Sequence, residues 1–226
     1  MGFLPLKIDL HVHTCYSEDS TITLEELILQ LKKKGLNGVA ITDHNTIEGA
    51  LKLTKMVNEK NNCGKLLIIP GIEVSTKGGH IIGINVTTSI PKGLSVEETI
   101  ERIHEDGGIA IAAHPRTLFK NGIGLSPKIL SLGLDAIEVI NSSLFPFQPL
   151  TRITKKFAEQ YNIPQTAGSD SHMPETVGLA YTLIDSDEIN IDSIIEAIKK
   201  GLTIPLGRGI PLSLRIKKIL GRKRKR

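Results

Sequence analysis

The stretch that decides the fold runs from residue 7 to residue 13 and reads Lys7-Ile8-Asp9-Leu10-His11-Val12-His13. Apolar and β-branched residues alternate with polar ones, a period of two that predicts a β-strand. His11 and His13 are two positions apart, so their imidazoles point to the same side of that strand. Two imidazoles at this spacing suit one metal ion, and the stretch therefore predicts one corner of a metal site.

Segments with strand-like and helical patterns alternate through the rest of the chain. A capping box, a hydroxyl residue followed three positions later by glutamate, begins helices after Thr23 and Ser95. Further strands are expected at 38–43, 66–69, 73–76, 81–86, 109–113, 136–140 and 166–167, with a break at Pro70-Gly71, and further helices at about 47–60, 150–160 and 191–198. Repeated β-α units predict a parallel sheet, open or closed into a barrel.

The composition is that of an ordinary globular protein with a charged end. The 226 residues are 40% hydrophobic, 23% charged and only 4% aromatic, with no Trp, so the core must rest on Ile, Leu and Val. Eight of the 28 basic residues and no acidic ones lie from Arg215 to Arg226, which leaves 20 basic against 24 acidic side chains elsewhere. The net charge of +4 therefore reflects a tail. We expect a single domain over residues 1–210 and a basic C-terminal helix or tail over 211–226.

Cysteine content and hydropathy predict the cellular compartment of the protein. Cys15 and Cys63 are too few for a disulfide framework. The N-terminus lacks the charged, apolar and small-residue pattern of a signal peptide. No apolar run approaches the ~18 residues of a membrane span. We expect a cytoplasmic protein without a transmembrane segment.

The positions of the histidines indicate a metal centre. Six of the seven lie at the C-terminal end of an expected strand or just beyond one, namely His11, His13, His44, His80, His114 and His172. Four carboxylates lie near the same strand ends, namely Asp19, Asp43, Glu73 and Asp170. Strand C-termini of a parallel barrel gather on one face, so these side chains are expected to converge there.

The same residues also have a structural interpretation. A single histidine is more often a hydrogen-bonded structural residue than a ligand, and His104, inside an acidic helix, is interpreted as solvent-exposed. Six clustered imidazoles without metal, however, would carry a large desolvation cost. Imidazole mixed with carboxylate suits Zn²⁺, Mn²⁺ or Fe²⁺.

Several segments, taken in order, resemble the PHP family, named for its polymerase and histidinol phosphatase members. The match covers residues 7 to about 205 and consists of Asp9-Leu10-His11-Val12-His13-Thr14, Thr42-Asp43-His44-Asn45, Pro70-Gly71-Ile72-Glu73, Gly79-His80, Ala113-His114-Pro115 and Gly168-Ser169-Asp170-Ser171-His172. Each motif is weak alone, but the ordered set is highly specific.

The resemblance implies a distorted (β/α)7 TIM-like barrel of the PHP type with a trinuclear metal centre. Carried over by position, the first metal would be held by His11, His13, Glu73 and Asp170. Glu73 would bridge to a second metal bound by His80 and His114, and Asp19, His44 and His172 would hold the third. Many relatives place the acidic ligand where this chain has Glu18; Asp19 matches an alternative spacing and is preferred.

This ligand set implies a phosphoesterase mechanism. A positively charged site attracts phosphate, and hydroxide between the first two metals would attack while the third orients phosphate oxygens. The residues expected to act in catalysis are Glu73, Asp170, His172 and Arg116. Arg116 would clamp phosphate, with an exposed loop charge as the alternative. Asp9 and Asp43 are expected to accept hydrogen bonds from ligand imidazoles.

Three functions remain open on the sequence. The first is hydrolysis of a phosphate ester of a small metabolite or nucleotide. The second is an exonuclease acting on RNA or DNA ends, and the third a non-catalytic, metal-bound module that binds a partner.

The basic tail has several interpretations. Leu212, Ile216, Ile219 and Leu220 lie at helical spacing with basic residues between and after them. This helix could dock on the body, meet an anionic membrane surface or hold nucleic acid, or simply end in a solvated charged turn. We expect deletion of residues 215–226 to leave turnover of a small phosphoester largely intact; loss of that activity would place the tail in the fold or the active site.

Overall fold

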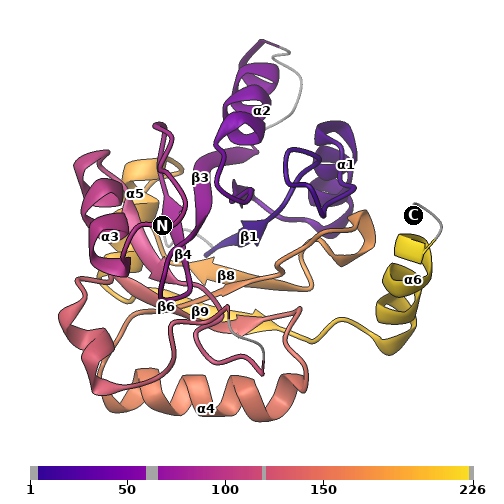
Figure 1. Ribbon diagram of the computed structural model, residues 1–226. Helices are drawn as coiled ribbons and strands as arrows, with labels where there is room; N and C mark the ends of the chain where they lie inside the picture. The colour runs from indigo at the N-terminus through magenta and orange to yellow at the C-terminus, as the bar shows by residue number, and fades with distance from the viewer. Residues whose placement is uncertain (1–4, 60–65, 119–120, 224–226) are drawn as a thin grey trace.

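The computed structural model describes residues 5–59, 66–118 and 121–223, and Figure 1 shows one sheet surrounded by helices. The strands of these segments are β1 (Leu6–Val12), β2 (Gly38–Ile41), β3 (Leu67–Ser75), β4 (His80–Ile84), β5 (Ile109–Ala112), β6 (Ala136–Asn141), β7 (Gln165–Gly168), β8 (Ala180–Ile184) and β9 (Thr203–Gly207). The α-helices are α1 (Leu24–Lys34), α2 (Glu48–Glu59), α3 (Val96–Glu105), α4 (Phe147–Gln160), α5 (Ile191–Lys199) and α6 (Leu212–Lys223). Short 3₁₀ helices lie at Pro127–Ser131 and Pro174–Thr176. None of the helices described is long and apolar enough to cross a bilayer.

The strands form a nearly closed, barrel-shaped sheet in the order β7-β6-β5-β4-β3-β2-β1-β8-β9. Closure occurs just beyond the end of β7, where the amide of Asp170 donates to the His11 carbonyl at 2.8 Å and the amide of His13 donates to the Ser171 carbonyl at 3.0 Å. The predicted α/β barrel is confirmed. Within the described segments the sheet has nine strands, because β8 and β9 add an antiparallel pair along β1.

Strand direction explains where the histidines lie. β4 runs antiparallel to β3 and β5, so the start of β4 lies at the same end of the barrel as the ends of those two strands. His80 is the first residue of β4, whereas His11 lies near the end of β1 and the remaining histidines of the motifs follow their strands. Both arrangements bring the imidazoles to one mouth of the barrel.

The expected break at Pro70-Gly71 is wrong, since β3 is continuous. Residues 67–70 pair with β2 and residues 71–75 pair with β4, so Pro70 lies where the strand changes partner. A Cβ on Gly71 would lie 2.6 Å from the carbonyl oxygen of Gly83, so the crossing requires glycine. The pair thus marks a change of partner rather than a turn.

Aliphatic side chains build the core, as the composition predicts. Ile8, Leu10, Ile69 and Ile82 belong to one buried cluster, while Val12 packs with residues of α1 and α2 in another. The pairing of β1 with β2 shifts register between Asp9 and Val12. Such irregularities re-aim side chains beside functional sites, and this one precedes His13 at the barrel mouth.

Both capping boxes form as predicted. The hydroxyls of Thr23 and Ser95 accept the amide protons of Glu26 and Glu98, and each glutamate accepts the amide proton of its cap. They fix the starts of α1 and α3 on the outside of the sheet (Figure 1).

Candidate metal centre

The histidine pair of β1 lies at the centre of the site. The Nε2 atoms of His11 and His13 are 3.0 Å apart, and both residues are fully buried. His11 Nδ1 lies 2.9 Å from a carboxylate oxygen of Glu138, and His13 Nδ1 lies 3.2 Å from the hydroxyl of Ser17. Ser17 donates its own proton to Asp43, so it accepts from His13. With both Nδ1 atoms engaged as donors, a proton or a metal cation must lie between the two Nε2 atoms.

Glu73 faces two groups of ligands with its two oxygens. Oε2 lies 3.5 Å from His11 Nε2 and 3.4 Å from His13 Nε2, while Oε1 lies 2.9 Å from His80 Nδ1 and 3.0 Å from His114 Nε2. The side chain is 1% exposed. This divided contact is the geometry expected of a carboxylate that bridges two cations.

Asp170 approaches the histidine pair from the segment that follows β7. Its Oδ1 lies 3.3 Å from His13 Nε2 and 3.7 Å from His11 Nε2. The backbone of Asp170 has φ of +50°, and that of His114 has φ of +27°, both in the left-handed region. Non-glycine residues adopt this region at some cost, which is typical of functional sites.

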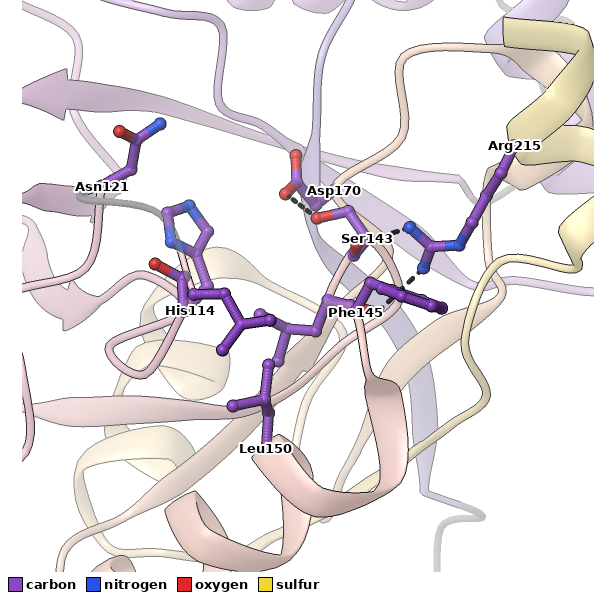
Figure 2. A pocket seen from close by; sticks show the side chains of 10 residues that line it. His114, Asn121, Ser143, Phe145, Leu150, Asp170 and Arg215 are labelled. Carbon is purple, nitrogen blue, oxygen red and sulfur yellow. Dashed lines mark hydrogen bonds between the residues drawn. The ribbon is translucent and has the colours of Figure 1, made fainter. Parts of the chain in front are cut away.

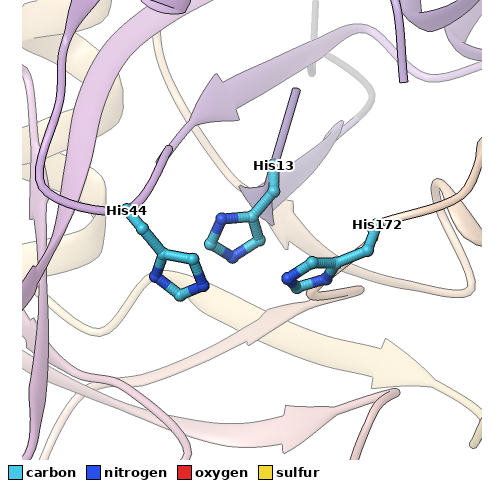
Figure 3. Close-up of side chains that lie close together, drawn as sticks. All are labelled: His13, His44 and His172. Atoms are coloured by element: carbon cyan, nitrogen blue, oxygen red, sulfur yellow. The ribbon is translucent and has the colours of Figure 1, made fainter. Parts of the chain in front are cut away.

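A third group lies toward solvent. The ring centroids of His44 and His172 are each 4.3 Å from that of His13, and the three imidazoles converge in Figure 3. Asp19 completes the group, with Oδ2 3.1 Å from His172 Nε2 and Oδ1 3.7 Å from His44 Nε2. The sequence left Glu18 as an alternative to Asp19 in this group. In the structure it is Asp19 that lies beside His44 and His172.

All nine residues expected as ligands thus lie at one mouth of the barrel. Four groups have donor atoms within 4.8 Å of one another: His13, His44 and His172; His11, His114 and Asp170; His11, His13 and Glu73; and His44, Glu73 and His80. These groups overlap, so proximity alone does not divide the ligands among separate ions.

Burial and charge make the cluster a site for cations. Burial, with His172 beside it, lowers the pKa of His13 to about 3. Burial opposes ionisation of Glu73 and Asp170, but the neighbouring imidazoles, His11 first, hold the pKa of both carboxyls well below their usual range. Despite burial, Glu138 and the other carboxylates raise the pKa of His11 well above its ordinary value. The centre therefore keeps ionised carboxylates in a buried place, and it retains positive charge on His11 when no metal is bound.

The donor set and this arrangement fit divalent transition metals. Imidazole nitrogens and carboxylate oxygens are the ligands that Zn²⁺, Mn²⁺ and Fe²⁺ share. A cation between the facing Nε2 atoms of His11 and His13 would satisfy both lone pairs. His114 Nδ1 is also buried without a hydrogen-bond partner in the described structure.

Asp9 and Asp43 do not act as the sequence suggested. Neither accepts a hydrogen bond from an imidazole in the described structure. Asp9 accepts the amides of Ser169 and Gly178, each at 2.8 Å, and Asp43 accepts the amide and hydroxyl of Thr14, each at 2.6 Å. Both carboxylates therefore hold the backbone segments that carry the expected ligands.

Glu138 is a residue of the site that sequence reasoning missed. Besides His11 Nδ1, it accepts the amide of His114 at 2.7 Å and the side-chain amide of Asn141 at 2.9 Å, and it is 2% exposed. The available signal was a glutamate within the otherwise apolar residues 136–140. Such a carboxylate fixes the orientation of a ligand imidazole.

Two pockets border the cluster. One, of about 220 Å³, is lined by His114 and Asp170 together with Asn121, Ser143, Phe145, Arg215 and neighbouring apolar residues (Figure 2). The other, of about 640 Å³, is lined by Asp19, His44, Tyr16, Lys92 and nearby loop residues. Arg116 is exposed and lines neither pocket among the residues described, so its role as a phosphate clamp stays a prediction.

Comparison with known proteins agrees with this architecture. The family model described as PHP-associated matches residues 152–203. One uncharacterized protein of Methanocaldococcus jannaschii is 42% identical over 147 residues, which cover 61% of this chain and 82% of that protein. A second uncharacterized protein of the same organism is 32% identical over 193 residues, which cover 83% of this chain and 73% of that protein. A 5'-3' exoribonuclease of Haemophilus influenzae is 29% identical over 109 residues, 46% of this chain and 38% of that protein.

Solved structures show the same fold. A two-domain protein from Bacteroides vulgatus containing a predicted PHP-like metal-dependent phosphoesterase superposes with a TM-score of 0.75 at 18% identity, over 90% of this chain and 65% of that one. An Endonuclease Q in complex with a 27-mer duplex substrate that has an abasic lesion superposes with a TM-score of 0.66 at 19% identity, over 86% of this chain and 56% of that one. The barrel and its cluster of histidines and carboxylates define a PHP-type domain. The chain belongs to the PHP family.

Proposed function

We propose that the protein is a metal-dependent phosphoesterase that hydrolyses a phosphate ester of a small metabolite or nucleotide. The observation that carries the proposal is Glu73, whose two oxygens contact two different sets of imidazoles within a buried cluster. The family relationship and the PHP-like phosphoesterase among similar structures support it.

The proposed ligand assignment is the one the family pattern implies. His11, His13, Glu73 and Asp170 would hold the first ion, Glu73, His80 and His114 the second, and Asp19, His44 and His172 the third. We propose Mn²⁺, Zn²⁺ or Fe²⁺ as the bound metals, three per chain. When bound, such cations supply an acidified water nucleophile and withdraw charge from phosphate oxygens.

The protein's own residues hold this set in place. Glu138 orients His11, while Ser17 orients His13 and is itself fixed by Asp43. The Ser143 hydroxyl lies 2.5 Å from Asp170 Oδ2. Ligands that are positioned in this way before substrate binds lower the cost of reorganisation during the reaction.

Action on RNA or DNA ends is the second candidate. Pockets lie at both the His114 and the His44 ends of the cluster, which leaves room for chain on either side of a scissile phosphate. The similarity to an exoribonuclease and to the Endonuclease Q fold favours this candidate as well. The basic residues of 211–226 other than Arg215 would then contact the nucleic-acid backbone; residues 224–226 lie outside those described.

A substrate panel with matched variants tests the proposal. Mn²⁺-loaded protein should hydrolyse at least one of a set of sugar phosphates, nucleoside phosphates and short oligonucleotides. Glu73→Gln should lower that turnover by about 1,000-fold or more, since removal of a charged group at the reacting centre costs several kcal/mol. His104→Ala, which lies outside the cluster, is the control. Folded, metal-loaded protein inactive on the whole panel would favour the non-catalytic module, and full activity in Glu73→Gln would overturn the assignment.

A further inference from the structure

We propose that the pocket between His114 and Arg215 binds the group esterified to the phosphate, and that this group carries a nucleobase. The proposal rests on the proposed function and narrows its substrate to nucleotides and nucleic-acid ends. The pocket shares His114 and Asp170 with the metal cluster, so a phosphate held by the cluster would extend its ester group directly into it. A volume of about 220 Å³ is below the ~300–1,000 Å³ of pockets that enclose a whole drug-sized ligand, so it fits one part of a substrate.

The wall of this pocket suits a flat ring. Leu118, Leu144, Phe145 and Leu150 line it, and Phe145 is 62% exposed although it is a large apolar side chain. The guanidinium carbon of Arg215 lies 5.4 Å from the centroid of the Phe145 ring. Aromatic rings and arginine planes are the surfaces on which proteins stack unpaired bases. A polyol or short aliphatic ester would leave most of this wall unused.

Arg215 is built into the wall rather than free to bind phosphate. Its Nε donates to the carbonyl of Ile210 at 3.1 Å, Nη1 to Ser143 at 3.0 Å, and Nη2 to Ser142 at 3.2 Å and Leu144 at 2.8 Å. Four of its five N–H donors are thus used on backbone carbonyls. The residue shapes the loop that bears Phe145.

Polar groups at the rim suit the edge of a base. Asn121 lines the pocket, its side chain makes no hydrogen bond among the described residues, and an amide offers both donors and an acceptor. Bases are commonly read by such groups on their exposed edges. The similarity to an exoribonuclease and to an endonuclease in complex with a 27-mer duplex substrate supports the same substrate class.

A binding experiment tests the pocket without requiring turnover. Saturation-transfer NMR on the metal-loaded, full-length protein should show contact with adenosine and none with ribose. Phe145→Ala should weaken adenosine binding about tenfold, because base stacking on an aromatic side chain is worth ~1–3 kcal/mol. Leu29→Ala, at the same 62% exposure but on α1, is the matched control and should bind as the wild type does. Phe145→Tyr should retain binding.

Kinetics then connects the pocket to hydrolysis. The ratio of kcat/KM for adenosine monophosphate to that for glycerol phosphate should fall about tenfold in Phe145→Ala, mainly through KM, and stay constant in Leu29→Ala. Equal binding of adenosine and ribose, or equal effects of the two alanine variants, would overturn the pocket proposal while leaving hydrolysis intact. Adenosine binding without turnover of any ester would support the pocket and overturn the proposed function.

Discussion

Replacing Arg215 with alanine should both destabilise the protein and weaken its metal site, although this residue belongs to the C-terminal helix. The four hydrogen bonds of Arg215 hold the carbonyls of residues 142–144 and 210. Ser143, in the same loop, contacts Asp170 at 2.5 Å. A chain of direct contacts therefore runs from α6 to an expected metal ligand, as Figure 2 shows.

The size of the effect follows from these contacts. A buried hydrogen bond from a charged donor contributes ~1.5–3 kcal/mol, and partial exposure of Arg215 reduces each of its four to about 0.5–1 kcal/mol. Ordering the side chain costs ~1.5–2 kcal/mol, which leaves a net loss centred on about 1 kcal/mol in the variant. For a domain of this length, a loss of that size lowers Tm by about 2–4 °C. Asp170 keeps its other hydrogen-bond partners, so the apparent Kd for Mn²⁺ should rise about three- to tenfold. This is less than the rise expected when a residue that contacts a metal ligand directly is replaced.

Thermal melts and Mn²⁺ titrations of three variants measure these effects. Arg215→Ala should show both changes, and Arg215→Lys should fall between, since one ammonium cannot reproduce a planar fork of donors. Arg152→Ala, an exposed arginine on α4, is the control. Equal melting temperatures and Kd values for Arg215→Ala and Arg152→Ala would refute the reasoning. Deleting residues 215–226 should likewise slow turnover, contrary to the expectation from sequence.

Three other perturbations test the site. Glu138→Gln should weaken Mn²⁺ binding about 10–100-fold by isothermal titration, because it alters the partner of His11; unchanged affinity would contradict that role. Carboxylates around the cluster raise the pKa of His11, His44 and His114 against the effect of burial, so protons compete with metal near neutral pH. Because metal binding must expel those protons, Mn²⁺ affinity should increase more than tenfold from pH 6 to pH 8, and a flat profile would argue against these ligands. Gly168→Ala should lower the free energy of unfolding, measured by urea denaturation, by about 2–3 kcal/mol, because the new Cβ would lie 2.2 Å from the Cβ of His11. Wild-type stability would show that β7 and β1 can move apart to accept a methyl group.

The sequence predicted that the expected ligands would converge, because their signal is positional. Strand alternation placed His11 and His13 on one side, and the motifs at the other strand ends placed their partners at the same mouth. The prediction did not depend on knowing the register shift in β1 or that β4 runs antiparallel to its neighbours. His80 begins β4 and His114 follows β5, and because these two strands are antiparallel, both residues lie at the same end of the barrel.

The supporting residues could not be predicted in this way. Glu138 lies among apolar residues in β6, and nothing in its spacing distinguishes a buried hydrogen-bond acceptor from a surface charge. Arg215 lies in a tail whose pattern predicts a helix but not the loop it contacts. Asp9 and Asp43 were assigned to imidazoles by adjacency, whereas their carboxylates hold backbone amides and hydroxyls.

Metal stoichiometry and turnover, measured on one preparation, test the central claim most directly. Protein purified without chelator, or reconstituted with Mn²⁺, should contain more than one equivalent of transition metal by elemental analysis. Its phosphoesterase activity should disappear with chelator and return in proportion to the metal restored. Folded protein that binds no metal after reconstitution, or that hydrolyses phosphate esters equally well in chelator, would contradict the account.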